Sequence, residues 1–169
     1  QAFEVDFQEA FHRGISTQHS SSFRIEENTF TRADNWTSLG NTAIVIENSG
    51  ASNTQVYKNE AFEMDYGYIG EGHCIDVQQA SSVGHQFLCN LNAMNQKNFL
   101  VRRDNYSTTQ TWMHSIRTQQ GSDASPAGNV FDQEVMVLDE SDYKNETQWV
   151  MNYWHAGGQQ QPWDLTVGW

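Results

Sequence analysis

The feature that most constrains this chain is an internal repeat of 31 residues. An apolar residue recurs at this interval and an asparagine follows it three positions later: Ile25 and Asn28, Val56 and Asn59, Phe87 and Asn90. A second segment keeps the same step, because residues 43–46 (Ala-Ile-Val-Ile) lie 31 positions before residues 74–77 (Cys-Ile-Asp-Val). A fixed period of about 20–50 residues is typical of solenoids, propellers and arrays, in which each repeat packs on the next.

Short segments with apolar or β-branched residues at alternate positions, bounded by Gly, Asn, Ser and Asp, predict strands. We expect strands at residues 13–18, 23–27, 42–47, 55–58, 73–78, 86–89, 98–102 and 115–118. Within them, Ile44 is expected to point inward and to stack on Ile75 of the next coil. Residues 31–40 and 63–72 are predicted to be loops. No ten-residue window has a helical period, so long helices are not expected.

These patterns together predict an all-β chain that forms a right-handed parallel β-helix of about four to five coils. The recurring asparagines are predicted to form a ladder at one turn, because Asn tolerates left-handed backbone and its amide can bond to the Asn one coil away. Asn129 is expected to be a fourth member. The repeat fades after about residue 132, so we assign residues 1–132 to the coils and 133–169 to a terminal strand with a capping segment.

Aromatic residues are concentrated near the C-terminal end of the chain, where they include Trp149, Tyr153, Trp154 and Trp163. The end of a solenoid exposes apolar core and open strand edges, which must be covered. We therefore predict an aromatic-rich cap over the last coil. The alternative is a carbohydrate-binding platform, because aromatic faces also pack against pyranose rings.

The chain is acidic, with 21 Asp and Glu against 9 Lys and Arg, a formal net charge of −12. Nucleic acids and anionic membrane surfaces are recognised by clustered basic residues, so no nucleic-acid partner is expected. The acidity favours solubility, and cation binding is the alternative. No apolar run approaches the roughly 18 residues of a membrane helix, so no membrane insertion is expected.

Two cysteines, Cys74 and Cys89, are too few for a disulfide scaffold. They are expected either to fill apolar sites or to form one bridge in an oxidising compartment. Lysine is scarce while Asn, Gln, Ser and Thr are plentiful, which is typical of secreted proteins. The chain starts at Gln1 without a methionine, which indicates a processed or excerpted boundary.

Several segments resemble the repeats of right-handed parallel β-helix proteins that Bacteroidota secrete or display on the cell surface: residues 23–30, 40–49, 56–59, 88–90, 116–121 and 126–131. The resemblance covers roughly residues 10–132. It implies the β-helix fold, a location outside the cell and export by the type IX secretion route, typically in large proteins of several domains. The sorting domain that this route uses is not evident in the sequence, so the chain is expected to be part of a longer one.

β-Helix enzymes that act on polysaccharides need paired acidic groups, or a basic residue beside bound calcium. The outward strand positions supply three candidate catalytic residues, Glu47, Asp76 and Arg102. Glu47 and Asp76 would form a diagonal carboxylate pair on neighbouring coils, and Arg102 would be a base or clamp. A solvated charged face is the favoured interpretation of all three.

Metal and cofactor motifs are missing from the sequence. The six histidines have no helical ligand spacing, and no EF-hand, phosphate loop or Gly-x-Ser-x-Gly element occurs. Asp139, Glu140 and Asp142 are of the residue type that holds a hard cation, so calcium is the one cofactor we consider. A solvated loop is the favoured interpretation of that run.

The sequence therefore favours a non-catalytic structural or interaction module of a secreted or cell-surface protein, such as a rigid spacer, an adhesin-like segment or a subunit of a complex. The alternative is a carbohydrate-active β-helix, either a polysaccharide lyase or glycoside hydrolase or a carbohydrate-binding module. The partners expected are a surface polysaccharide or another protein.

Overall fold

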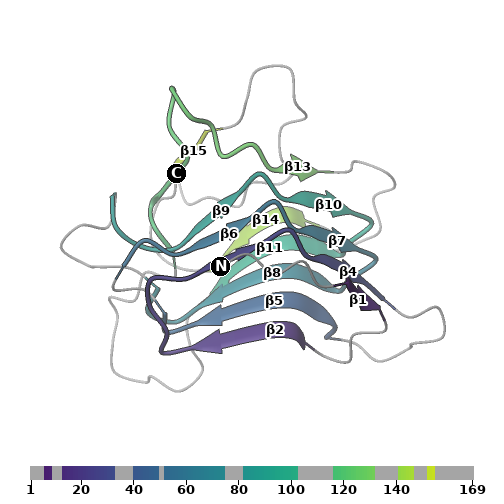
Figure 1. Cartoon of the computed structure of the whole chain (residues 1–169). Coiled ribbons are helices and arrows are strands. Elements are labelled where there is room, and N and C mark those ends of the chain that lie inside the picture. The colour runs from purple at the N-terminus through teal and green to yellow at the C-terminus, as the bar shows by residue number, and fades with distance from the viewer. Residues whose placement is uncertain are drawn as a thin grey trace.

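Figure 1 shows the computed structural model of the chain, in which strands of successive coils lie stacked side by side. The structure describes residues 6–8, 13–32, 40–49, 52–74, 82–102, 116–131, 141–146 and 152–154, with the backbone alone for 6–8 and 141–145. All regular elements in these ranges are β-strands. In that part of the chain no helix is long and apolar enough to cross a membrane.

Three parallel sheets, here named A, B and C, form the walls of the solenoid. Sheet A contains β1 (Asp6–Gln8), β4 (Thr29–Thr31), β7 (Glu60–Phe62), β10 (Leu91–Ala93) and β13 (Val130–Phe131). Sheet B contains β2 (Arg13–Gln18), β5 (Thr42–Glu47), β8 (Tyr66–Glu71), β11 (Lys97–Arg102) and β14 (Ser141–Asn145). Sheet C contains β3 (Arg24–Glu26), β6 (Gln55–Tyr57) and β9 (Gln86–Leu88), and a separate pair is formed by β12 (Gln119–Gln120) and β15 (Asn152–Tyr153).

Each coil runs through sheet C, then sheet A, then sheet B, before the chain rises to the next coil (Figure 1). Neighbouring strands within the three sheets pair in parallel, and Ile25, Val56 and Phe87 are register partners in sheet C. The parallel β-helix predicted from the 31-residue repeat is therefore confirmed. The coil count is lower than the predicted four to five: sheet C has three strands, so there are about three complete turns, flanked by strands that extend only sheets A and B.

The asparagine ladder at the turn between sheets C and A is confirmed. The side-chain amide of Asn28 donates to Asn59 Oδ1 (2.8 Å), that of Asn59 to Asn90 Oδ1 (3.3 Å) and that of Asn90 to Asn129 Oδ1 (2.9 Å). The backbone N–H of each of these three donors bonds to the same oxygen, at 2.9–3.1 Å. All four side chains are buried, so the ladder satisfies polar groups that water does not reach.

The core is a continuous apolar column inside the solenoid, because inward side chains of successive coils stack on one another. Aromatic rings fill its middle: the centroids of Tyr68 and Phe99 are 5.2 Å apart, and those of Phe87 and Phe99 are 4.9 Å apart. At the N-terminal end Ile25 is only half-buried, whereas its partner Val56 is fully buried. Val56 lies between its register partners Ile25 and Phe87, so it is covered on both sides within sheet C.

The predicted stacking of Ile44 on Ile75 is wrong. Ile44 pairs with Tyr68 in β8, not with Ile75, and β8 lies within residues 63–72, which were predicted to be a loop. The cause is loop length: ten residues separate β4 from β5, but only three separate β7 from β8. Residues 73 and 74 of the strand predicted at 73–78 are not in a strand, and residues 75–80 lie outside the described ranges.

The remaining strand predictions are close to the structure, apart from the one at residues 115–118. Residues 116–118 are not in a strand, and β12 begins at Gln119. The strand β14 continues sheet B within the segment 133–169. Both cysteines are free thiols: Cys74 is buried and Cys89 exposed. Burial raises the pKa of the Cys74 thiol to about 12, so this side chain is an inert filler.

Candidate functional site

The outer face of sheet B, where the candidate catalytic residues were expected, has two columns of side chains. Val45, Ile69 and Leu100 form an apolar column in which no residue is more than 3% exposed. Beside it runs a polar column of register partners: Gln18, Glu47, Glu71 and Arg102. The first column is thus apolar and buried. The side chains of this face that could take part in a reaction lie in the second column.

Hydrogen bonds hold the polar column in place. Arg102 donates from Nε and Nη2 to Glu71 Oε2, at 2.9 and 2.7 Å, and the Glu71 side chain is only 7% exposed. Gln18 Nε2 donates to Glu47 Oε1 at 3.0 Å. A buried carboxylate is stable only when it is paired and bonded, and Arg102 provides both for Glu71. These contacts join neighbouring coils across sheet B.

The structure places Glu47 and Arg102 on the two coils that flank Glu71, and Asp76 lies outside the described residues. Glu71 was missed because residues 63–72 were predicted to be a loop. A signal was present in the sequence: Glu71 lies 31 residues before Arg102, the same interval as in the asparagine ladder. In the described ranges, no three His, Cys, Asp or Glu side chains are grouped to hold a metal.

Histidine is the residue type most often used in acid–base catalysis, but the environment of His85 is that of a core residue. It is fully buried, its Nδ1 is 2.9 Å from Thr54 Oγ1, and its ring packs edge-on against Phe87. Burial lowers the pKa of His85 from 6.5 to about 3, so the imidazole is neutral at physiological pH. With no access to solvent, it cannot exchange protons with a bound substrate.

Two of the four candidate aromatic binding residues are described, and both lie at the C-terminal end of the stack. Asn129 Nδ2 donates to the Tyr153 hydroxyl at 2.9 Å, so Tyr153 ends the asparagine ladder. Its ring packs on Phe131, with centroids 6.2 Å apart. Trp154 is joined to the last turn by backbone bonds to Gln120 (3.0 Å) and from Ala127 (2.7 Å). Trp149 and Trp163 lie outside the described residues.

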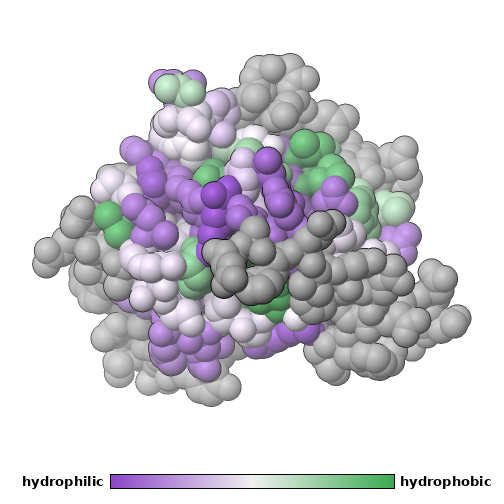
Figure 2. Space-filling model, in the orientation of Figure 1, coloured by the Kyte–Doolittle hydropathy of each residue, from purple (hydrophilic) through white to green (hydrophobic). Residues whose placement is uncertain are grey.

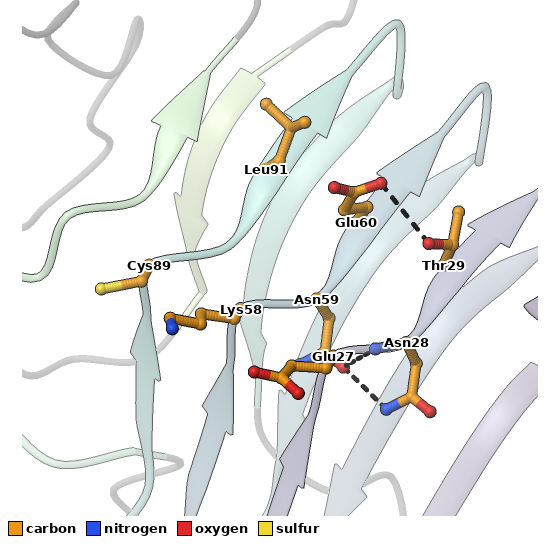
Figure 3. A pocket seen from close by; sticks show the side chains of 8 residues that line it. All are labelled: Glu27, Asn28, Thr29, Lys58, Asn59, Glu60, Cys89 and Leu91. Carbon is orange, nitrogen blue, oxygen red and sulfur yellow. Dashed lines mark hydrogen bonds between the residues drawn. The ribbon is translucent and has the colours of Figure 1, made fainter. Parts of the chain in front are cut away.

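A groove of about 440 Å³ runs over the asparagine turn between sheets C and A, and we call it the turn groove. Figure 3 shows two rows of side chains along it, one from the turn and one from the first residues of the sheet A strands. The lining residues are Glu27, Lys58 and Cys89 in the first row, Thr29, Glu60 and Leu91 in the second, and Asn28 and Asn59 between them. Hydrophilic residues gather over this part of the molecule in the space-filling view (Figure 2).

Backbone conformation explains why the first row points outward. Glu27, Lys58 and Cys89 have φ values of 60°, 54° and 56°, the left-handed region that non-glycine residues rarely adopt. Each precedes a ladder asparagine, so the chain bends there and aims the side chain away from the core. Gly128 takes the equivalent position on the last turn, with φ 67°. The buried amide ladder stabilises this strained turn and repeats it on each coil.

The turn groove carries charges of both signs, with an excess of acid. Glu27 and Lys58 are exposed and Glu60 is half-buried. The one hydrogen bond between groove side chains of the second row joins Thr29 Oγ1 to Glu60 Oε2, at 3.4 Å. Lys58 Nζ lies 5.2 Å from the centroid of the Tyr57 ring, beside the groove. Sequence reasoning did not identify this site, because its first-row residues share a backbone conformation and no residue type.

Comparisons with known proteins give no relative. No family model matches the chain, and neither the curated proteins nor the solved structures contain a match.

Proposed function

We propose that this chain is a non-catalytic interaction module, a rigid β-solenoid that presents binding surfaces from its outer walls. The observation that carries this proposal is that the side chains in the polar column of sheet B are hydrogen-bonded to one another. Arg102 holds Glu71, and Gln18 holds Glu47, in bonds that join neighbouring coils. The partly buried pair of Glu71 and Arg102 is a structural crosslink, and side chains held in this way are poorly suited to changing protonation state or to receiving a substrate.

Rigidity supports the same proposal. The ladder of buried asparagines and the aromatic column restrain each coil on both sides, so a ligand would meet surfaces that are already ordered. Preformed surfaces bind without the entropic cost of ordering loops. The molecule would act as a spacer or as an adhesin-like segment, with a partner protein or a surface polysaccharide as its target.

Activity measurements with a matched variant test the non-catalytic proposal. Purified protein would be incubated with neutral and acidic polysaccharides, with and without calcium, and new reducing ends or unsaturated products would be measured. We expect no turnover. Turnover by the wild type that Glu47→Gln abolishes, without a change in thermal unfolding, would refute the proposal.

Carbohydrate binding is the second candidate function, and the turn groove is the observation that favours it. Its volume of about 440 Å³ suits a small ligand. Carboxylates, an amine and a hydroxyl line it, and such groups hydrogen-bond to sugar hydroxyls. Isothermal titration with oligosaccharides tests this function, and binding that persists unchanged in a Glu27→Gln, Glu60→Gln double variant would place it elsewhere.

A secreted or cell-surface location is part of the proposal. The resemblance to β-helix repeats of Bacteroidota, the low lysine content and the polar composition support it. The full-length gene sequence tests it: we expect an export signal or a sorting domain of the type IX route in the same open reading frame. A complete reading frame without any export signal would argue against this location.

A further inference from the structure

We propose that the outer face of sheet A, towards its C-terminal end, docks a protein segment that carries apolar residues flanked by Lys or Arg. The surface consists of Phe62 in β7, Leu91 and Ala93 in β10, Met94 directly after it and Val130 in β13, and we call it the apolar patch. This inference rests on the proposed interaction function, and it adds the surface and the chemistry of the partner.

The outward positions of sheet A, and the position directly after each strand, change from polar to apolar along the solenoid. Strand register and the 31-residue step align the coils. At the same three positions, the first coil has Thr29, Thr31 and Arg32, the second has Glu60, Phe62 and Glu63, and the third has Leu91, Ala93 and Met94. The first coil shows that the fold accepts polar residues at all three positions, so the wall itself does not require apolar ones on the third.

The strand β10 has the reverse of the pattern expected for a wall that faces water. Its middle residue, Asn92, is fully buried and donates from Nδ2 to the Val130 carbonyl at 3.2 Å. Leu91 and Ala93, which alternate with it, point outward and are half-buried. A sheet with one solvated face normally places polar residues outward and apolar residues inward. Core packing therefore does not explain the apolar residues on the outer face of this strand.

Two exposed side chains make the apolar patch accessible. Met94 is 53% exposed and Val130 is 42% exposed, and these two are the exposed large hydrophobic side chains of the described ranges. Val130 is the register partner of Leu91, and Met94 follows Ala93, so all four belong to one surface. Hydrophobic residues gather over β10 and β13 in the space-filling view (Figure 2). A contiguous exposed apolar patch is typical of a protein interaction site.

Carboxylates border the apolar patch on the side of the second coil. Glu60 is the register partner of Leu91, and the Glu63 backbone N–H donates to the Ala93 carbonyl at 3.1 Å. Neither carboxylate forms an ion pair with a residue that the structure describes. Protein interfaces combine an apolar centre with a polar rim, and opposite charges across the rim speed encounter and fix register. Lys or Arg beside the partner's apolar residues would complement this border.

Lys58 does not neutralise this border. It lies in the turn groove, and Figure 3 shows its side chain directed away from Glu60 and Leu91. Its Nζ is 5.2 Å from the centroid of the Tyr57 ring, which belongs to sheet C. The formal charge of the whole chain, −12, adds to the attraction for a basic partner.

Other occupants match the apolar patch less well. A second copy of this chain in a symmetric contact would bring the same two carboxylates, Glu60 and Glu63, and the same net charge of −12, so like charges would meet. A sugar needs hydrogen-bonding groups or a flat aromatic face, and the aliphatic side chains of Leu91, Met94 and Val130 offer neither. A basic protein segment with apolar residues matches both the patch and its border.

Selection from a phage library of random short peptides tests the inference. Wild-type protein and a Leu91→Ser, Met94→Ser double variant would be immobilised separately, and enriched peptides would be synthesised for fluorescence anisotropy. We expect the wild type to enrich peptides that combine Leu, Ile, Phe or Trp with Lys or Arg. These peptides should bind the double variant at least about tenfold more weakly, because the apolar contacts are lost.

Further variants test the border and provide controls. A Glu60→Gln, Glu63→Gln double variant should bind the selected peptides about threefold more weakly at low salt, and the difference should shrink at high salt because exposed charges are screened. The matched controls are Leu88→Ser, at a half-buried outward position of sheet C on the same coil, and Glu27→Gln, at an exposed position of the first coil. Neither control should change binding. Thermal unfolding of each variant confirms folding.

Four results would overturn the inference. Enriched peptides without basic residues would contradict the chemistry of the partner, and enrichment that the Leu91→Ser, Met94→Ser variant retains would place the peptide site elsewhere. Enrichment of no peptide would remove the docking surface. A dimer in sedimentation velocity that the same variant loses would mean that a second copy covers the patch. None of these results bears on catalysis, which turnover of polysaccharides tests separately.

Discussion

Replacing Asn59 by alanine should destabilise the fold far more than the same change at Asn28. Asn59 lies inside the ladder and its side chain takes part in five hydrogen bonds. It accepts from the backbone N–H and the side-chain amide of Asn28, at 3.1 and 2.8 Å, and donates to the carbonyls of Ile25 and Tyr57 and to Asn90. Among the described residues, Asn28 at the end of the ladder uses its side chain only as a donor, to Glu26 O and Asn59 Oδ1.

The magnitudes follow from what each truncation leaves behind. Asn59→Ala leaves the backbone N–H of the buried Asn28 without an acceptor, at a cost of about 1–3 kcal/mol for that group, and loses four further bonds. We expect a loss of about 3 kcal/mol in the free energy of unfolding. In Asn28→Ala, Asn59 Oδ1 keeps the bond from the backbone N–H at position 28, so about 1 kcal/mol should be lost.

Urea unfolding followed by far-ultraviolet circular dichroism measures both variants against the wild type. The two changes remove the same atoms from the same kind of turn, so intrinsic propensity cancels in the comparison. A loss at Asn59 that is no larger than the loss at Asn28 would refute the idea that coil-to-coil amide bonds stabilise the turn.

Three further perturbations test other parts of the structure. Tyr153→Phe should lower the free energy of unfolding, measured in urea, by about 1 kcal/mol, because Asn129 loses the hydroxyl that ends the ladder while the ring still packs on Phe131. An unchanged free energy of unfolding would mean that the hydroxyl does not stabilise the end of the ladder. His85 has a pKa of about 3 in the fold against 6.5 ordinarily, so the unfolded chain binds the proton more tightly and stability is lost as pH falls below 6.5. Between pH 7 and pH 5 the protonation of His85 in the unfolded chain should lower the free energy of unfolding by about 2 kcal/mol. The corresponding shift of the urea midpoint with pH should be absent in His85→Phe. Gly67→Ala should lower the free energy of unfolding by about 2 kcal/mol, because a Cβ at this position would lie 2.7 Å from the backbone oxygen of Asn98. A variant as stable as the wild type in thermal unfolding would contradict that close approach.

The repeat was sufficient to predict sheet C and the ladder from Asn28 to Asn90, because the period is constant there. Ile25, Val56 and Phe87 keep the 31-residue step in the structure, as do Asn28 and Asn59. The two-residue turn between sheets C and A cannot change length without breaking the amide bonds. Where geometry fixes the spacing in this way, sequence spacing translates directly into register.

Sheet B was harder to predict, because loops on either side of it change length in compensation. The step from β2 to β5 is 29 residues, that from β5 to β8 is 24, and that from β8 to β11 is 31. The match between Ile44 and Ile75 was therefore coincidental. Glycines at positions 67 and 70 also gave β8 the appearance of a loop, although Gly67 is required by the packing around it.

The candidate site was predicted only in part, for two physical reasons. The polar column of sheet B depends on Glu71, and the error in register hid it. The turn groove depends on three unlike residues, Glu27, Lys58 and Cys89, which share a positive φ and no chemical type. Residue type alone does not reveal a site that is defined by backbone conformation.

The central claim is that side chains one coil apart stack in columns with the observed register. Nuclear Overhauser contacts in a methyl-labelled sample test it most directly. We expect contacts from the Ile25 methyls to Val56, from Val56 to the Phe87 ring, and from Ile44 to the Tyr68 ring. A spectrum in which Ile25 and Val56 show no contact, while their neighbours along the chain do, would contradict the winding of this backbone.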